Sequence, residues 1–229
     1  MTDTVLDVNG AQLVLRPEGA IWWPERQLLA VADLHFEKGS SYGVRGQFLP
    51  PYDTRATIVR LDQLCQELAP RTVVALGDSF HDGNAALRMA PDDRAYLRAL
   101  TQRCGWIWIT GNHDEGLQGV PDLTFVETLQ MGPLTFRHDP SEGLAHGEVC
   151  GHLHPKAAVT VKGRRISRPS FVSDGRRLVL PAFGAYTGGL DVFDPAFFPV
   201  FPLGFQAFLL GRDKVYAFGA GRLRARSAA

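Results

Sequence analysis

The chain has 229 residues, 45% of them hydrophobic, and its 24 basic side chains balance 24 acidic ones. This composition excludes a disordered chain, a collagen and a polyelectrolyte, and it predicts one globular domain over residues 1–229. Three widely spaced cysteines cannot form a disulfide scaffold, the N-terminus lacks a secretory signal, and the most apolar stretch is too short to span a bilayer. We therefore expect a cytoplasmic protein that does not contact membranes.

The N-terminal half begins with predicted strands and then a helix. An Asn-Gly pair at residues 9–10 is typical of a tight hairpin turn, and residues 28–33 form a short apolar run, as in a strand buried on both faces. Residues 35–47, rich in glycine and serine, are predicted to be a loop. Residues 53–68 place apolar side chains at helical spacing, and Asp53 is their expected N-cap.

The same cycle then repeats along the chain. A strand is predicted at residues 71–78, a helix at 91–104 and a further strand at 106–114. Strands that alternate with helices indicate a largely parallel sheet. From about residue 123, short alternating segments separated by Gly, Pro and Asp predict a second, mostly antiparallel sheet. The predicted fold class is α/β, a two-sheet β-sandwich flanked by helices in a single domain.

Polar residues follow each predicted parallel strand. Asp33 and His35 follow the first strand, Asp78 follows the second, and Asn112 and His113 follow the third. Because the carboxyl ends of parallel strands meet at one edge of a sheet, we expect these side chains to converge. The seven histidines also lie in one part of the chain and mostly where a strand meets a loop: His35, His81, His113, His138, His146, His152 and His154. So many histidines beside strand-end acids predict a metal site.

The chemistry of these side chains limits the metal. Aspartate, asparagine and histidine without cysteine suit manganese, iron or zinc better than calcium, and they give no reason for a structural zinc. Asp33 and His35, two apart on an extended segment, are expected to point the same way. His152 and His154 form a second such pair. Together with a further aspartate and an asparagine, these pairs exceed the needs of one ion, so we expect two divalent ions that share a carboxylate.

The order of these motifs resembles the calcineurin-like metallophosphoesterase superfamily. Its motifs match Asp33-x-His35, Gly77-Asp78, Gly111-Asn112-His113-Asp114, a later lone histidine and Gly151-His152-x-His154. Over nearly the whole chain, the segments GHLHPK and GRRLVLPAFGAYTGGLDV further resemble the bacterial ligase-associated DNA damage response endonucleases. His81 follows Asp78 by three residues, which is similar to the superfamily's double-strand-break-repair nucleases.

The resemblance implies two overlapping sets of ligands with Asp78 shared between them, and manganese as the resident metal. The first ion would be held by Asp33, His35, Asp78 and His154. The second would be held by Asp78, Asn112, His138 and His152. For the lone histidine, His138 fits the superfamily order and His146 is the rival.

Two further residues are candidates for the chemistry itself. His113 directly follows a ligand, so we expect it to stabilise phosphoryl oxygens or protonate the leaving group and not to bind metal. Either His81 or Asp82 would orient it. His81 is also a candidate to contact the scissile phosphate, whereas Asp82 has a turn cap as its alternative role.

The charges are divided unevenly along the chain. Residues 1–155 hold 12 basic and 20 acidic residues, a formal charge of −8, and residues 156–229 hold 12 and 4, a charge of +8. Four cations follow the last metal motif closely: Lys162, Arg164, Arg165 and Arg168. Such a run is usually a solvated strand face, but beside a phosphodiesterase site it predicts contacts with a nucleic-acid backbone.

These features predict a metal-dependent phosphodiesterase that cuts single-stranded or flexible DNA in DNA repair, with a hydroxide between two ions as nucleophile. The resemblance implies a DNA ligase, a helicase and an exonuclease-like protein in the same pathway. One alternative is a phosphatase or small-molecule phosphodiesterase acting on nucleotides, cyclic nucleotides or lipid-linked diphosphates. A second is a non-catalytic scaffold, which would lack ligands, and none is missing here.

Overall fold

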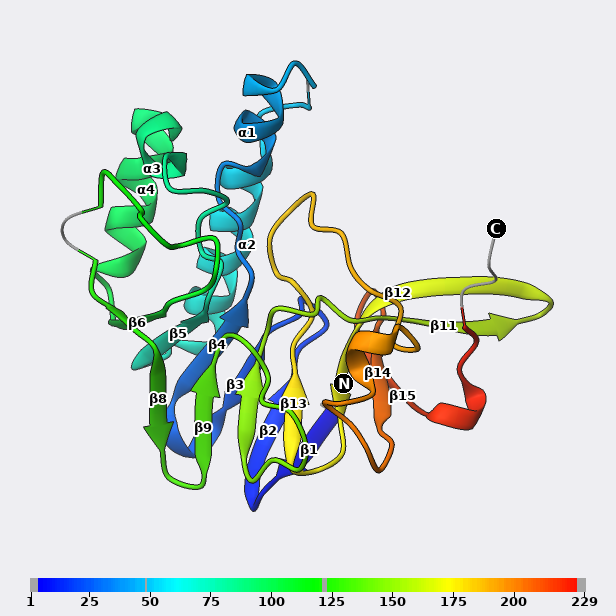
Figure 1. Cartoon of the computed structure of the whole chain (residues 1–229). Helices are drawn as coiled ribbons and strands as arrows, with labels where there is room; N and C mark the ends of the chain where they lie inside the picture. The colour runs from blue at the N-terminus through cyan, green and yellow to red at the C-terminus, as the bar shows by residue number, and fades with distance from the viewer. Residues whose placement is uncertain (1–3, 48, 121–122, 226–229) are drawn as a thin grey trace.

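The computed structural model describes residues 4–47, 49–120 and 123–225, and it contains two sheets that face each other (Figure 1). The first sheet has the strand order β1-β2-β3-β4-β5-β6-β7. Its first four strands pair antiparallel, and β4 to β7 pair parallel. The strands are β1 (Thr4–Val8), β2 (Ala11–Leu15), β3 (Ile21–Trp23), β4 (Leu28–Ala32), β5 (Thr72–Leu76), β6 (Gly105–Ile109) and β7 (Phe125–Val126).

The second sheet has the order β15-β14-β12-β13-β10-β9-β8, and β11 pairs with β12 alone. Its pairs are antiparallel except at the centre, where β10 runs parallel to both β9 and β13. The strands are β8 (Thr128–Met131), β9 (Leu134–Arg137), β10 (Glu148–Cys150), β11 (Lys156–Val161), β12 (Arg164–Ser173), β13 (Arg177–Val179), β14 (Gln206–Leu210) and β15 (Val215–Gly219). In Figure 1, β11 and the first half of β12 project away from the sandwich as a two-stranded ribbon.

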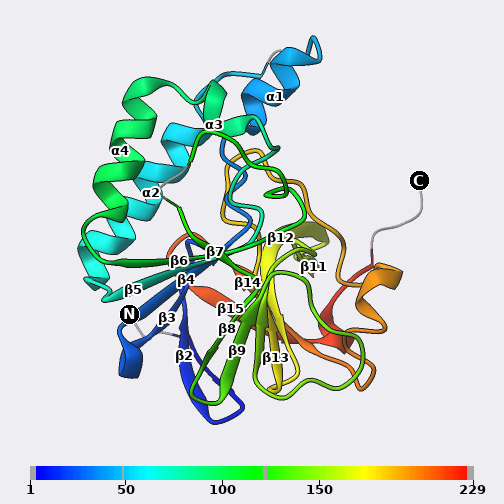
Figure 2. The ribbon, with the colours of Figure 1, turned by 60° about the vertical axis from the view of Figure 1, so that its left-hand side comes forward.

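The α-helices lie together over the outer face of the first sheet (Figure 2). None in the described part of the chain is long and apolar enough to span a bilayer. They are α1 (Lys38–Val44), α2 (Asp53–Leu68), α3 (Ala85–Arg88) and α4 (Pro91–Thr101), and short 3-10 helices lie at η1 (Pro24–Arg26), η2 (Pro195–Phe197) and η3 (Ala220–Arg222).

Strand β4 shows how the layers are built. Alternate side chains of a strand point to opposite faces, so Leu28 and Ala30 pack between the two sheets, whereas Leu29 and Val31 pack beneath the helices. Both faces are therefore covered, which is why residues 28–33 read as a continuous apolar run. The predicted two-sheet sandwich with outer helices is confirmed.

Two local predictions are wrong. Residues 35–47 are not all loop, because helix α1 occupies residues 38–44. Asp53 does not cap α2, because the N-cap is Tyr52 and Asp53 lies inside the first turn. The two errors share one cause: the buried Asp53 carboxylate accepts the backbone N–H of Gly39 at 2.8 Å, and this tertiary bond fixes a helix that glycine and serine would not form alone.

Candidate metal centre

The polar cluster lies where β4, β5 and β6 end. Asp33 directly follows β4, and its backbone N–H donates to the carbonyl of Gly77, after β5, at 3.2 Å. The backbone N–H of His35 donates to the carbonyl of Asp78 at 2.9 Å. The loops after the two strands are thus joined by backbone hydrogen bonds, and their side chains are brought to the same edge of the sheet.

Five of the predicted ligands have left-handed backbone conformations. Their φ angles are positive, between 44° and 67°, at Asp33, His35, Asp78, His152 and His154. The extended geometry expected for the Asp33–His35 and His152–His154 pairs is therefore wrong, although both pairs do reach the same cluster. Non-glycine residues in this region are strained, and such strain gathers at sites where function requires a fixed geometry.

Two glycines allow the cluster to pack this tightly. A Cβ atom on Gly77 would lie 2.2 Å from Nδ1 of His138, and one on Gly151 would lie 2.6 Å from Oδ2 of Asp33. Any larger residue would displace the neighbouring imidazole or carboxylate. This close approach explains why each glycine accompanies a ligand motif in the sequence.

The structure brings together the side chains predicted for the first ion. Nε2 of His154 lies 3.2 Å from Oδ1 of Asp33 and 3.4 Å from Nε2 of His35. Asp33 and His35 are buried, and His154 is half-buried. The Asp33 carboxylate also accepts the backbone N–H of His152 at 3.1 Å, which ties the two histidine-bearing loops to one carboxylate.

A second group surrounds His138. Its Nε2 lies 3.2 Å from Oδ1 of Asn112 and 3.1 Å from Nδ1 of His152. His138 is buried, whereas Asn112 and His152 are exposed, so this group is the more open of the two. These are the side chains predicted for the second ion.

Asp78 lies between the two groups. Its Oδ2 is 3.8 Å from Nε2 of His35, and its Oδ1 is 3.5 Å from Nε2 of His138. One carboxylate therefore faces both groups, one oxygen to each. This is the arrangement that a shared ligand requires.

The hydrogen bonds of His138 test whether a cation fits. Its Nδ1 lies 3.0 Å from the carbonyl of Leu76, so Nδ1 carries the proton and Nε2 presents a lone pair to the cluster. That lone pair faces the amide oxygen of Asn112 and a carboxylate oxygen of Asp78, which are also acceptors. Acceptors that face one another without a donor repel, and a metal ion between them removes the conflict.

The charges of the cluster lead to the same conclusion. Asp33 and Asp78 are buried, and no Lys or Arg in the described residues forms a salt bridge with either carboxylate. Buried carboxylates need a compensating positive charge. The donor set, made of carboxylate and amide oxygens with imidazole nitrogens, fits manganese, iron or zinc.

The alternative for the lone histidine lies elsewhere. His146 is exposed on the loop between β9 and β10, and it belongs to none of the groups of potential ligands in the described residues. His138 is in contact with both Asp33 and Asp78. The geometry thus favours His138, as the order of motifs did.

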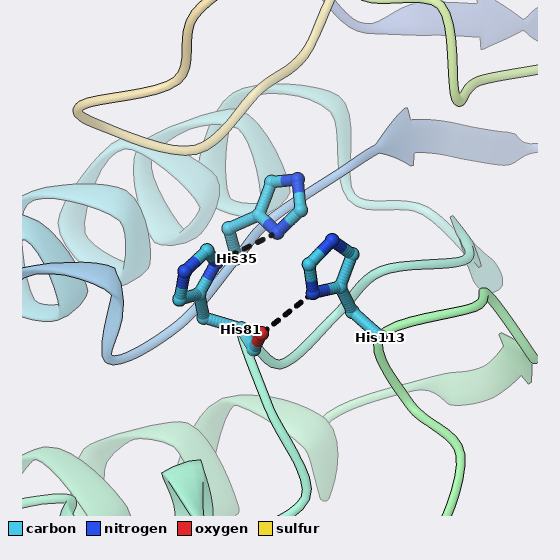
Figure 3. Close-up of side chains that lie close together, drawn as sticks. All are labelled: His35, His81 and His113. Carbon is cyan, nitrogen blue, oxygen red and sulfur yellow. Dashed lines mark hydrogen bonds between the residues drawn. The ribbon is translucent and has the colours of Figure 1, made fainter. Parts of the chain in front are cut away.

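His113 faces the cluster beside His35 and His81 (Figure 3). Its backbone N–H donates to Oδ1 of Asp78 at 2.9 Å, and its Nδ1 lies 2.7 Å from the carbonyl oxygen of His81. The rings of His81 and His113 are stacked, with centroids 5.2 Å apart. Nδ1 therefore carries a proton bound to the carbonyl, and Nε2 is left to exchange one with a substrate.

The group that orients His113 was predicted incompletely. It is the main-chain carbonyl of His81, not the His81 imidazole and not the Asp82 carboxylate. Asp82 accepts two hydrogen bonds from Arg88, at 2.9 and 2.7 Å. Although burial raises the pKa of Asp82, the bonds from Arg88 and Ser41 outweigh it and lower that pKa to about 2. Asp82 also accepts the backbone N–H of Asn84, which is the turn-capping role.

Burial keeps the neighbouring imidazoles neutral. Desolvation, followed by the nearby charges of His154 and Lys38, lowers the pKa of His35 to about 2. Desolvation, followed by Lys38 and His113, lowers the pKa of His81 to about 4. Neutral imidazoles are the form that binds a metal ion or accepts a proton.

Sequence reasoning missed the role of Asp114. Its buried carboxylate accepts backbone N–H groups of Ser79, Phe80 and Gly111, at 3.0 to 3.2 Å. Burial raises its pKa to about 6 in spite of these bonds. Asp114 thus joins the loops after β5 and β6, and its place directly after His113 was the only signal of it.

The predicted DNA-binding cations lie on the projecting ribbon. Lys162, Arg164, Arg165 and Arg168 are all exposed. Arg165 lies 3.3 Å from Asp191, and no salt bridge in the described residues involves the other three. The ribbon begins at Lys156, two residues after His154, so it leaves the sandwich beside the cluster.

Comparisons with known proteins follow this geometry. The sequence profile of the calcineurin-like phosphoesterases matches residues 26–191. No curated protein matches the chain significantly. Among solved structures, the chain is similar to the Pseudomonas putida nuclease MPE, with a TM-score of 0.72 and 28% sequence identity. That match covers 95% of this chain and 100% of the nuclease, so it spans both sheets.

Proposed function

Because the chain belongs to the calcineurin-like phosphoesterase family, whose members are metal-dependent hydrolases of phosphoester bonds, we propose that it is a phosphodiesterase that cuts DNA. The proposed substrate is single-stranded or flexible DNA, and the proposed setting is DNA repair. The observation that carries this proposal is the likeness to a nuclease over 95% of the chain. The cluster around Asp78 supports the phosphoester chemistry, and the basic ribbon beside it supports a polymeric substrate.

We propose that the cluster holds two divalent ions, with manganese as the resident metal. The first would bind Asp33, His35, Asp78 and His154, and the second would bind Asp78, Asn112, His138 and His152. Bound there, such ions would act as Lewis acids on phosphoryl oxygens and make water a better nucleophile.

His113 is the proposed proton donor to the leaving oxygen. The carbonyl of His81 fixes the proton on Nδ1, so the second ring nitrogen, Nε2, is the one that gives up a proton in the imidazolium form. Nε2 lies 4.0 Å from Oδ2 of Asp78, and this carboxylate favours the charged ring that donates. The backbone bond from His113 to Asp78 keeps the donor in register with the proposed ligands.

The projecting ribbon is the proposed grip on the DNA backbone. Lys162, Arg164 and Arg168 are exposed and free of salt bridges within the described residues, so they are available to phosphates. A cluster of metal ligands handles one phosphate, and a nuclease must also hold the strand on either side of it. A ligase, a helicase and an exonuclease-like protein are the proposed functional partners.

A substrate panel tests the proposal. The purified chain would be assayed with Mn²⁺, Fe²⁺, Zn²⁺, Mg²⁺ and Ca²⁺ on an aryl phosphodiester, the aryl monoester, a cyclic nucleotide, and circular single- and double-stranded DNA. We expect Mn²⁺-dependent cleavage of the diester and of single-stranded DNA. Hydrolysis of the monoester or the cyclic nucleotide, with intact DNA, would instead identify a phosphatase or small-molecule phosphodiesterase.

A further inference from the structure

Helix α1 presents one polar face that the metal cluster does not use. Lys38, Tyr42 and Arg45 follow one another at intervals of four and three residues, so they lie on the same side of the helix and its C-cap. Lys38 and Tyr42 are half-buried and Arg45 is exposed. A cation, an aromatic ring and a second cation are thus aligned along α1.

This face is directed at His81. The ring of Tyr42 is nearly parallel to that of His81, with centroids 6.3 Å apart and an interplanar angle of 17°. His81 is in turn stacked on His113 at 5.2 Å, also at 17°. A row of near-parallel rings therefore runs from α1 to the proposed proton donor.

The two cations are close enough to the cluster to act on it. Lys38 interacts electrostatically with Asp78 and Asp33, and both Lys38 and Arg45 disfavour the protonated form of His81. Within the described residues neither cation forms a salt bridge. Both charges remain available to an anion that reaches the cluster.

Buried hydrogen bonds hold α1 in this position. The hydroxyl of Thr54 accepts the backbone N–H of Glu37 at 2.8 Å and donates to its carboxylate at 2.9 Å. Asp53 accepts the backbone N–H of Gly39, and Nε of Arg88 donates to the hydroxyl of Ser40 at 3.0 Å. A preorganised face binds its ligand with less loss of conformational entropy.

We propose that the Lys38–Tyr42–Arg45 face is a nucleotide subsite, in which Tyr42 stacks on the base next to the scissile phosphate and the two cations bind the adjoining phosphate. This inference rests on the proposed function, since it requires a nucleic-acid substrate. An aromatic ring between cations suits a base and its backbone, because every base has a flat face that stacks and each nucleotide carries one phosphate. The position beside His113 assigns the subsite to the nucleotide at the cut and not to a distant part of the strand.

The test uses the metal-loaded full-length protein and a single-stranded oligonucleotide. Tyr42→Leu is expected to raise KM for the oligonucleotide about tenfold while kcat stays within about twofold, because base stacking contributes to binding. Tyr42→Trp keeps a stacking face and is expected to retain the wild-type KM. Tyr216→Leu, at an exposed tyrosine of β15, is the matched control and is expected to change nothing.

A substrate with abasic residues around the cut separates stacking from structure. Wild type and Tyr42→Leu should cleave this substrate with the same KM, because the base that Tyr42 would contact is gone. An equal loss on the abasic strand, or an equal loss of kcat on an aryl phosphodiester, would overturn the subsite and leave Tyr42 as a support for His81.

The outcome for the wild type distinguishes the two proposals. If wild type hydrolyses the aryl diester and leaves every DNA intact, the proposed function fails. If wild type cuts the oligonucleotide and Tyr42→Leu matches it in KM, only the subsite fails. Arg45→Gln adds an independent readout, since loss of one phosphate contact should reduce the slope of log affinity against log salt by about 0.7.

Discussion

Helix α1 and the β11–β12 ribbon both carry cations beside the metal cluster, but they are anchored in different ways. Helix α1 is fixed by hydrogen bonds to the buried side chains of Asp53 and Thr54, and one of its cations, Lys38, is half-buried. The outer half of the ribbon is exposed, and in the described residues Arg165–Asp191 is its one salt bridge. The two regions therefore differ in rigidity and in access to solvent, although both are basic.

This difference suggests a division of labour. Charges near a buried cluster are weakly screened and act at short range, so α1 suits the nucleotide at the cut. Exposed charges act through counterion release and depend on salt, so the ribbon suits the strand farther away. The predictions below separate the shared centre from the two flanking regions.

The largest effect is expected at the centre that both regions serve. Asp78→Ala should lower kcat by several powers of ten on an aryl diester and on DNA alike, because both groups of proposed ligands face this carboxylate. Elemental analysis should show fewer than two ions per chain, and circular dichroism should show a folded protein. Retention of more than about a tenth of the wild-type rate would exclude Asp78 as a shared ligand.

His113→Ala should give the next largest effect, and again without regard to the flanking regions. Loss of a general acid typically costs between about 10² and 10⁴ in rate. The loss should shrink with a good aryl leaving group, which needs less protonation, and metal content should stay at the wild-type value. A loss of the same size with good and poor leaving groups would argue against a proton donor.

The ribbon should affect DNA alone. Replacing Arg164, Arg165 and Arg168 together with glutamine is expected to lower DNA cleavage roughly tenfold at low salt and to reduce the salt slope by about two units, at about 0.7 per lost contact with a single strand. Hydrolysis of the aryl diester should not change. A double replacement of Arg212 and Lys214, exposed in the β14–β15 turn, is the control. If both activities fall together, the ribbon is structural.

The elements that sequence predicted well are those with strong local signals. The helix at residues 53–68 was predicted with its observed bounds because its apolar side chains repeat at the helical period. The strand within residues 28–33 was found because both its faces are buried. The polar residues that follow β4, β5 and β6 converge as expected, since parallel strands place their ends at one edge.

What sequence did not reveal depends on tertiary contacts. Helix α1 has little intrinsic helix propensity and is fixed by Asp53, fourteen residues away. The orientation of His113 comes from a backbone carbonyl, which every residue possesses and no pattern can mark. The left-handed conformation of the ligand pairs is likewise imposed by the loops around them, because short spacing in sequence does not determine φ.

The smallest expected effect lies in α1 itself and compares two glycines of one helix. A Cβ on Gly39 would lie 2.7 Å from Oδ1 of Asp53, whereas a Cβ on Gly43 would meet nothing within 4 Å. Alanine is favoured over glycine within a helix by up to about 1 kcal/mol. Gly43→Ala should therefore raise the free energy of unfolding, and Gly39→Ala should lower it by about 1–3 kcal/mol through overpacking.

The effect of Gly39→Ala on activity sharpens the comparison of the two flanking regions. Because the new methyl group must displace either the buried Asp53 carboxylate or α1, the face that carries Tyr42 should shift relative to His81. We expect kcat/KM on DNA to fall roughly threefold to tenfold with the salt slope of the ribbon unchanged, since a shift of an ångström in a positioning element carries costs of this order or larger. Gly43→Ala should match wild type in the same assay. Equal behaviour of the two variants, in unfolding by urea and in DNA cleavage, would mean that the anchoring of α1 by Asp53 does not matter for the cut.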